Sequence, residues 1–254
     1  MVQQQRTAAI DDPQQPKGLV YFYGLPAVGK STLNREIAAV AAAEGIAVIN
    51  ANAGEYRRTH PEYSWLRTAE DFGKYPDVLD EISIKTLREG LDHTYATRGA
   101  AICTFDQTGT RKSSRDHAWN EVLRRDGLHM LVVDVHTSET REQLLRSFRD
   151  KVGNGDFKGM SVEEAVKDFS RRYDAYIQSA TDYRDDQLFR EHQFHHVRFD
   201  RYTGEIALGG VNGHGLLQDI VLQAIRNVDA RYRIADEKTT DTRMAVGYPL
   251  PSVP

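Results

Sequence analysis

A glycine-rich stretch near the start of the chain has the spacing of a phosphate-binding loop. Residues 24–32 read Gly-Leu-Pro-Ala-Val-Gly-Lys-Ser-Thr and fit the pattern G-x-x-x-x-G-K-[ST]. Glycines let such a loop curl so that successive backbone N–H groups point inward at an anion. Lys30 can supply a cation to the β- and γ-phosphates, and the Ser31 hydroxyl can coordinate Mg²⁺. The residues predicted to hold the nucleotide are Gly24, Ala27, Gly29, Lys30, Ser31 and Thr32.

A carboxylate for the same metal follows a later apolar run. Asp106 comes directly after residues 100–105, which are apolar enough to form a buried strand. Ligands of doubly wound sheets lie at the carboxyl ends of the strands, so Asp106 is expected beside the phosphate loop. It can hold Mg²⁺, accept the proton of an acceptor hydroxyl, or simply cap the next segment. Asp134 ends another predicted strand and is a weaker candidate for a direct role.

The elements that must position these residues alternate between strand and helix. Short apolar runs predict strands, and longer runs with apolar residues at helical spacing predict helices. The predicted strands are 19–23, 46–50, 100–105, 129–135 and 195–200, with a turn and a further strand in 201–208. The predicted helices are 30–43, 76–97, 113–125, 161–180 and 215–228, with one more after residue 138. The alternation predicts a three-layer α/β fold of the P-loop type: a mostly parallel, doubly wound sheet with helices on both faces.

Local signals suggest where two of these helices begin. Thr137 or Ser138 is expected to cap the helix that follows the fourth strand, with Glu139 in its first turn. Residues 161–164, Ser-Val-Glu-Glu, have the form of a capping box. The three glycines in residues 151–159 predict a loop between these two helices.

Length and composition favour one domain. The chain has 254 residues, of which 40% are hydrophobic, and a net charge of −4. We expect residues 1–16 to be disordered, 17–230 to form the domain with 60–98 as a helical insertion on the substrate side, and 231–254 to form a tail. The charge argues against a general nucleic-acid or membrane surface. Cys103 is the single cysteine and lies in an apolar run, so it is expected in the core. A reducing, cytoplasmic location is the default expectation, since no secretory signal or membrane span is evident.

Five segments, in this order and spacing, resemble one enzyme family. They are GLPAVGKS (24–31), NAGEYRR (52–58), TFDQTGTR (104–111), DKVGNGDF (150–157) and DFSRRYDAY (168–176). Together they are similar to the kinase domain of 6-phosphofructo-2-kinase/fructose-2,6-bisphosphatase, over about residues 17–230. The phosphate loop alone is unspecific, whereas the segments in series are fairly specific. We do not expect the phosphatase domain of bifunctional members here, because Gly-His-Gly at 213–215 does not match its Arg-His-Gly motif.

The resemblance implies ATP-dependent transfer to the 2-hydroxyl of fructose 6-phosphate, giving fructose 2,6-bisphosphate. It implies that Lys30, Ser31 and Thr32 hold ATP and Mg²⁺, that Asp106 and Thr108 face the reacting hydroxyl, and that Lys151 contacts the transferring phosphate. Arg57, Arg58, Arg172 and Tyr176 would bind the sugar phosphate. Arginine suits this task because it binds phosphate in bidentate fashion. Arg172 and Tyr176 are four residues apart and therefore share a helix face.

Each of these residues also has an ordinary structural interpretation. Arg57 and Arg58 can be solvated loop residues, Arg172 a helix-surface residue, Lys151 an exposed lysine, Thr108 a turn residue and Tyr176 a core residue. The resemblance has departures too. Two family positions for sugar-phosphate arginines are occupied by Asp80 (or Lys85, with a different anchoring) and by Ser114. Arg115, next to Ser114, is predicted to contact the substrate in its place, and the family's Asn after Thr108 is Gly109.

Several functions remain open at this point. The first is a kinase of a small phosphorylated sugar, with fructose 6-phosphate as the favoured acceptor. The second is a kinase of another sugar phosphate, a nucleoside, a nucleotide, an adenylylsulfate or a small alcohol. The third is a nucleotide-binding regulatory module that hydrolyses ATP slowly. The expected partners are ATP, Mg²⁺ and a small phosphorylated substrate, without nucleic acid or membrane, and the resemblance suggests a homodimer.

Overall fold

One six-stranded sheet organises the chain. The structure is a computed structural model, and it describes residues 16–149, 152, 157–210 and 215–245. The strands lie in the order β2-β3-β1-β4-β5-β6. They are β1 (Lys17–Tyr23), β2 (Ala47–Asn52), β3 (Ala101–Asp106), β4 (Leu128–His136), β5 (His195–Asp200) and β6 (Ile206–Gly209). All neighbours pair in parallel except β5 and β6, which are antiparallel. The predicted mostly parallel α/β sheet is therefore confirmed.

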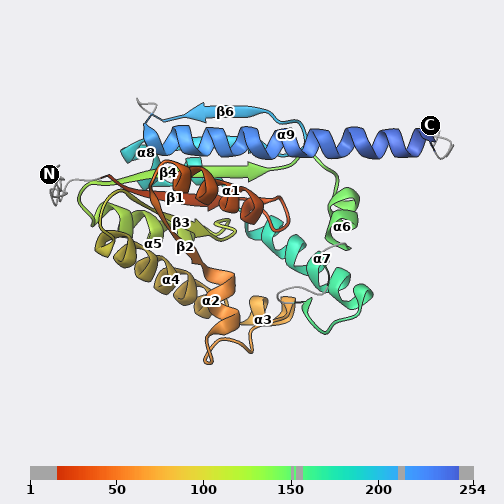
Figure 1. Cartoon of the computed structure of the whole chain (residues 1–254). Coiled ribbons are helices and arrows are strands. Elements are labelled where there is room, and N and C mark those ends of the chain that lie inside the picture. Colours follow the sequence, from red (N-terminus) through yellow and green to blue (C-terminus); the bar gives the residue numbers. More distant parts are fainter. Residues whose placement is uncertain (1–15, 150–151, 153–156, 211–214, 246–254) are drawn as a thin grey trace, which may run out of the picture.

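Helices cover both faces of this sheet. Helices α1 (Lys30–Ala43) and α9 (Leu216–Ala245) pack on one face. Helices α4 (Pro76–Ala96), α5 (Lys112–Leu123) and α8 (Gln187–His192) pack on the other. Figure 1 shows α9 running along the sheet beside α1, with α4 and α5 on the opposite side. Each face forms its own apolar core, and Cys103 lies fully buried in the second, as predicted.

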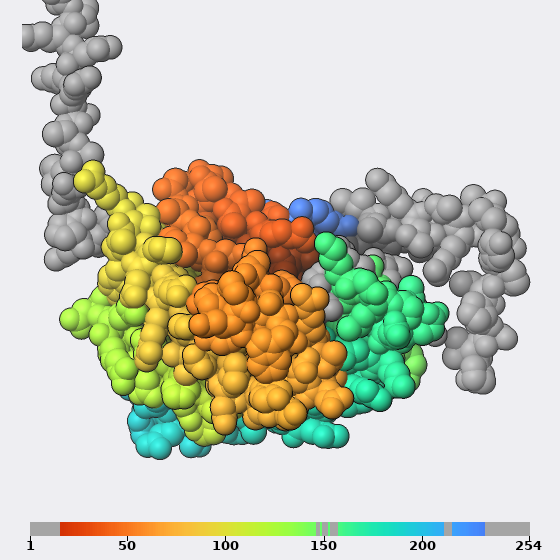
Figure 2. All heavy atoms as spheres, turned by 90° about the horizontal axis from the view of Figure 1, so that it is seen from below, coloured from red at the N-terminus to blue at the C-terminus, as the bar shows by residue number. Residues whose placement is uncertain are grey.

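A smaller group of elements lies at the carboxyl ends of the strands. It comprises α2 (Ala53–Thr59), α3 (Ala69–Lys74), α6 (Arg141–Arg149), α7 (Val162–Ser179) and the 3₁₀ turn η2 (Tyr183–Asp185). Helices α6 and α7 share a separate apolar cluster, in which the rings of Phe148 and Phe169 stack 4.0 Å apart. The backbone N–H of Ala69 in α3 donates to the Asp168 carboxylate in α7 (2.7 Å). Figure 2 shows the segment that contains α3, in orange, beside α7, in green.

Most predicted elements are present, and the differences have physical reasons. Helix 30–43 and the capping box at Ser161 are confirmed. The helix after β4 begins at Arg141, because Thr140 and Gln143 cap it reciprocally, so the predicted cap at Thr137 or Ser138 is wrong. Helix α9 continues past residue 228 to Ala245, since no glycine or proline interrupts that stretch. Residues 1–15 and 246–254 and most of the predicted 151–159 loop lie outside the described residues.

Within the described residues, no helix combines the length and apolar character that a membrane crossing requires.

Candidate functional site

The phosphate loop joins β1 to α1, and its backbone has positive φ angles that residues with a side chain rarely adopt. Gly24 and Gly29 have φ angles of 139° and 101°. A Cβ atom at Gly24 would lie 2.1 Å from the carbonyl oxygen of Val135, so only glycine fits there. Ala27 also has a positive φ, 67°, which is uncommon for a residue with a side chain. The resulting curl leads directly into the N-terminus of α1, whose positive dipole end favours an anion.

Lys30 folds back over this loop. Its ammonium group donates to the carbonyl oxygens of Gly24 (2.8 Å) and Leu25 (2.7 Å), which use two of its three N–H donors. The side chain is buried, and burial lowers the pKa of Lys30 to about 8, although the nearby charge of Asp106 opposes this shift. The loop therefore holds a cation whose charge is costly until an anion binds beside it.

Asp106 and Ser31 meet at the end of β3. The Ser31 hydroxyl donates to Oδ2 of Asp106 (2.7 Å), and the Asn52 amide donates to the same oxygen (3.2 Å). Asn52 ends β2 directly opposite Asp106 in the sheet register. A hydroxyl and a carboxylate are ligands that Mg²⁺ accepts, and this ion normally keeps several waters and phosphate oxygens as well. The two side chains thus fit a magnesium ion bound together with a nucleotide.

A cavity of about 440 Å³ opens from the phosphate loop toward α2, α4 and α7. It brings together nine of the residues predicted from the sequence: Ala27, Lys30, Ser31, Arg57, Arg58, Asp106, Thr108, Arg172 and Tyr176. Sequence reasoning did not assign roles to other polar residues of its wall, namely Asn52, Ser83, Gln107 and Arg111. Asn52 and Arg111 lie inside the quoted segments 52–58 and 104–111, so the signal for them was present.

Two arginines of this cavity are held in place by an aromatic ring. The guanidinium carbons of Arg57 and Arg172 lie 4.9 Å and 4.4 Å from the centroid of Phe72. Arg57 also donates to the carbonyl oxygen of Leu66. Arg172 donates to Asp168 (2.6 Å) and to the carbonyl oxygen of Arg67. Because both side chains are buried and oriented by these contacts, little side-chain entropy remains to be lost when an anion binds.

Tyr176 and Thr108 complete this part of the wall. Burial raises the pKa of Tyr176, while its hydrogen bond with Thr108 and the charge of Arg172 oppose the shift. The phenol therefore stays protonated near neutral pH and can donate a hydrogen bond. Thr108 follows Asp106 by two residues, which places a hydroxyl beside the carboxylate in the same cavity.

Asp80 lines another part of the cavity. Its two carboxylate oxygens accept hydrogen bonds from the hydroxyls of Ser113 (2.8 Å) and Ser114 (2.5 Å), which lie in the first turn of α5. Ser114, which aligns with a family position for a sugar-phosphate arginine, lines the cavity. Lys85, the alternative to Asp80, does not line the cavity, and its ammonium group instead lies over the ring of Tyr63.

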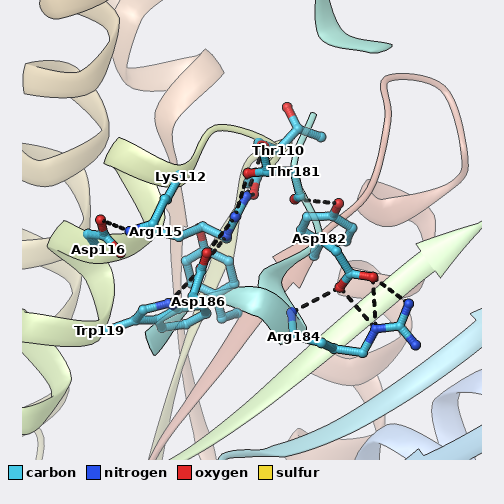
Figure 3. A network of polar contacts seen from close by, with 12 residues as sticks. Thr110, Lys112, Arg115, Asp116, Trp119, Thr181, Asp182, Arg184 and Asp186 are labelled. Carbon is cyan, nitrogen blue, oxygen red and sulfur yellow. Dashed lines mark hydrogen bonds and ion pairs between the residues drawn. The ribbon is translucent and has the colours of Figure 1, made fainter. Parts of the chain in front are cut away.

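Arg115 is not a wall residue, which corrects its predicted contact with the substrate. Its guanidinium is fully buried beneath the site and forms a bidentate pair with Asp186 (2.7 and 2.9 Å). Its remaining N–H groups donate to the carbonyl oxygens of Gly109 and Thr110 and to the Thr181 hydroxyl. Figure 3 shows this network, with the Trp119 indole also donating to Asp186. All five donors are used within the protein, so none is available to a ligand.

Three other predictions have different outcomes. The backbone N–H of Thr32 donates to the carbonyl oxygen of Gly29, and its side chain does not line the cavity. Lys151 lies outside the described residues. Asp134 is buried away from the cavity, where burial raises its pKa to about 6 and Arg198 lies 3.6 Å away.

A second cavity, of about 350 Å³, lies at the amino ends of the strands, opposite the phosphate loop. Its wall is mainly apolar and includes Ile46, Ile102, Met130 and Leu217. It contains none of the residues predicted to bind phosphate, so the cavity beside the phosphate loop is the candidate site.

Known proteins are similar to this chain over most of the residues that form the sheet and its helices. A family model described as 6-phosphofructo-2-kinase matches residues 5–214. Over 165 residues the chain is 22% identical to human 6-phosphofructo-2-kinase/fructose-2,6-bisphosphatase 4, covering 63% of this chain and 34% of that protein. Over 162 residues it is 23% identical to human 6-phosphofructo-2-kinase/fructose-2,6-bisphosphatase 3, covering 62% of this chain and 30% of that protein. The chain therefore spans about a third of the length of these curated relatives.

Solved structures of two kinases align with the chain at TM-scores below 0.5. A fungal RNA kinase is 11% identical with a TM-score of 0.48, and the match covers 93% of each chain. The hexameric APS kinase from Thiobacillus denitrificans is 20% identical with a TM-score of 0.34, covering 64% of this chain and 30% of that one.

Proposed function

The chain belongs to the 6-phosphofructo-2-kinase family, and from this membership we propose that it transfers the γ-phosphoryl group of ATP to a hydroxyl of a small phosphorylated sugar. Fructose 6-phosphate, which would give fructose 2,6-bisphosphate, is the first acceptor to consider, because the names of the relatives include this activity. The observation that carries the proposal is a single cavity that joins Lys30 and Asp106 to buried arginines on α2 and α7.

The donor half of the proposed site uses the phosphate loop. Backbone N–H groups of residues 27–31 and the third N–H of Lys30 would bind the phosphates of ATP. Ser31 and Asp106 would hold Mg²⁺, which supplies charge neutralisation at the β- and γ-phosphates when bound. Ser31 and Asn52 both donate to Oδ2 of Asp106, which leaves Oδ1 to accept the proton of the attacking hydroxyl. Phosphoryl transfer depends mainly on this kind of positioning and charge stabilisation.

The acceptor half of the proposed site uses the arginines. Arg57, Arg58 and Arg172 would bind the phosphate of the sugar, with Tyr176 donating a hydrogen bond to it. Phe72 fixes two of these guanidinium groups. Thr108 would orient the reacting hydroxyl toward Asp106. One observation, the Asp80 carboxylate in the cavity wall, would limit which acceptors of this class are bound.

The test is an acceptor screen with ATP and Mg²⁺. We expect ADP release that depends on the sugar phosphate supplied, with the position of the new phosphate assigned by ³¹P NMR. Lys30→Ala should lower the rate by at least about a hundredfold, because one preorganised contact to the transferring phosphate is lost. ADP release that is the same with every acceptor would contradict the proposal and would favour a regulatory module that hydrolyses ATP. A cytoplasmic location and a homodimer remain predictions for localisation and gel filtration to test.

A further inference from the structure

The cavity wall contains a carboxylate where an anion-binding site would otherwise be expected. Asp80 lies near the start of α4 and faces the first turn of α5, where two serine hydroxyls donate to its oxygens. The N-terminus of a helix attracts negative charge. The N-terminus of α5 is a position that an anionic group of a ligand would favour. The Asp80 carboxylate already occupies this position.

This carboxylate has no ion pair in the part of the chain that the structure describes. Its hydrogen-bond partners are the neutral hydroxyls of Ser113 and Ser114. Arg111 also lines the cavity, but its Nη1 donates to the carbonyl oxygen of Pro76 (3.5 Å) and not to Asp80. The charge of Asp80 is therefore not cancelled by a paired cation, and it acts on whatever enters the cavity.

The wall formed by α2 and α7 has the opposite character. Arg57 and Arg172 lie there, both buried and both held by Phe72, with Arg58 and Tyr176 beside them. An anionic group of the acceptor is attracted to this wall. A second anionic group on the same molecule, if it reached the α4–α5 wall, would meet Asp80 and be repelled.

We propose that Asp80 determines specificity by admitting acceptors with one anionic group and rejecting those with a second. The acceptor binds its single phosphate at the arginines and presents hydroxyl groups to Asp80, whose oxygens accept their hydrogen bonds. The inference rests on the proposed kinase function and narrows its substrate class to polyhydroxylated monophosphates. Specificity of this kind arises from repulsion as well as from attraction.

Matched pairs of acceptors test this assignment. Fructose 6-phosphate and fructose 1,6-bisphosphate differ by one phosphate, and glucose 6-phosphate and 6-phosphogluconate differ by one carboxylate. Equilibrium binding is measured calorimetrically in the presence of Mg²⁺ and a non-hydrolysable ATP analogue, so that the readout does not depend on turnover. For the wild type we expect the monophosphate of at least one pair to bind at least tenfold more tightly than its partner.

Two variants remove the charge of Asp80. Asp80→Asn keeps the shape and can still accept a hydrogen bond from a serine hydroxyl, and Asp80→Ser provides a smaller replacement if the first variant folds poorly. We expect either variant to reduce the preference for the monophosphate at least tenfold, mainly through tighter binding of the doubly anionic partner. The control is Asp92→Asn, which removes an exposed charge paired with Arg125. Asp92 lies about 18 Å farther along the same helix, and this control should leave the preference unchanged.

The outcomes separate this inference from the proposed function. A wild type that phosphorylates an acceptor, together with an unchanged preference in both Asp80 variants, would overturn the inference alone. A wild type that neither binds nor phosphorylates any of these compounds would overturn the proposed function and the inference with it. A loss of preference in Asp92→Asn equal to that in Asp80→Asn would also overturn the inference, because it would indicate a general effect of charge.

Discussion

In the free folded protein, burial makes the positive charge of Lys30 unfavourable. Its ammonium group is buried between the carbonyl oxygens of Gly24 and Leu25, and burial lowers its pKa to about 8. A bound triphosphate would favour the protonated form and raise this pKa again. Nucleotide binding and protonation of Lys30 are therefore coupled.

This coupling predicts how nucleotide affinity depends on pH. Below about pH 8 the free protein already holds the proton, so affinity should be flat. Above that value a proton must be taken up on binding, and the affinity should fall by up to about tenfold per pH unit. Titration of an ATP analogue between pH 6.5 and 9.5 measures this. Lys30→Met should bind more weakly and lack the decline above pH 8, and an equal decline in that variant would assign it to another group.

The residues of the site differ in how far the sequence predicts them. Lys30, Ser31 and Asp106 follow from a motif and from their position after strands. Arg115 is different, because its neighbour Ser114 faces Asp80 while Arg115 itself shares the buried face of α5 with Ala118, Trp119 and Val122. Their spacing of three, four and seven residues is the helical signal that places Arg115 inside. A residue next to an aligned substrate position therefore need not contact the substrate, because consecutive residues of a helix point in different directions.

Elements of the site are connected by buried polar contacts that no local sequence pattern reveals. Arg115 in α5 joins Asp186, before α8, to the backbone of Gly109 and Thr110. That backbone belongs to the loop that carries Thr108 and Arg111 into the cavity. Arg115 therefore holds this loop in position from beneath the cavity. The helices could be predicted from periodicity, but this connection depends on residues 71 positions apart.

Removal of one member of this buried pair should be costly. Arg115→Met leaves the Asp186 carboxylate buried without its partner, and we expect a loss of about 3–5 kcal/mol in unfolding free energy. Combining Arg115→Met with Asp186→Leu should restore most of that loss, because no uncompensated charge remains. Urea denaturation of the single and double variants gives the comparison. A single-variant loss below about 1 kcal/mol would show that Asp186 finds another partner or water.

At the scale of the whole molecule, the alternation of strands and helices predicts the layers but not the strand order. The order β2-β3-β1-β4-β5-β6 depends on which strands pair across long stretches of chain. A central position for β1 places the phosphate loop between the ends of β3 and β4. The sequence could suggest that Asp106 and Asp134 end strands on either side of the loop. Only the packing decides that Asp106 reaches the cavity while Asp134 is buried near η2 and Arg198.

Asp134 should influence the stability of the whole fold. Burial raises its pKa from the ordinary 3.8 to about 6, so the folded protein binds a proton more readily than the unfolded chain does. The stability that comes with this proton is complete below about pH 4 and is lost as the pH rises through 6. Between pH 5 and pH 8 the loss amounts to about 1 kcal/mol.

A comparison of the wild type with Asp134→Asn isolates this contribution. The introduced asparagine is neutral at both pH values, in the folded and in the unfolded protein, so the Asp134→Asn variant lacks this contribution to the pH dependence. The decrease from pH 5 to pH 8 should be about 1 kcal/mol smaller in the variant than in the wild type, as measured by urea denaturation. Parallel pH profiles would show that Asp134 titrates in the folded protein as it does in the unfolded chain.

The packing of Arg172 links two distant segments of the chain. Its guanidinium lines the cavity, lies over the ring of Phe72 in α3, and donates to the carbonyl oxygen of Arg67. Replacing the segment before α4 would therefore also remove contacts that orient a side chain on α7. Single substitutions of Asp80 on α4 or Ser114 on α5 would change the cavity wall and leave those contacts in place.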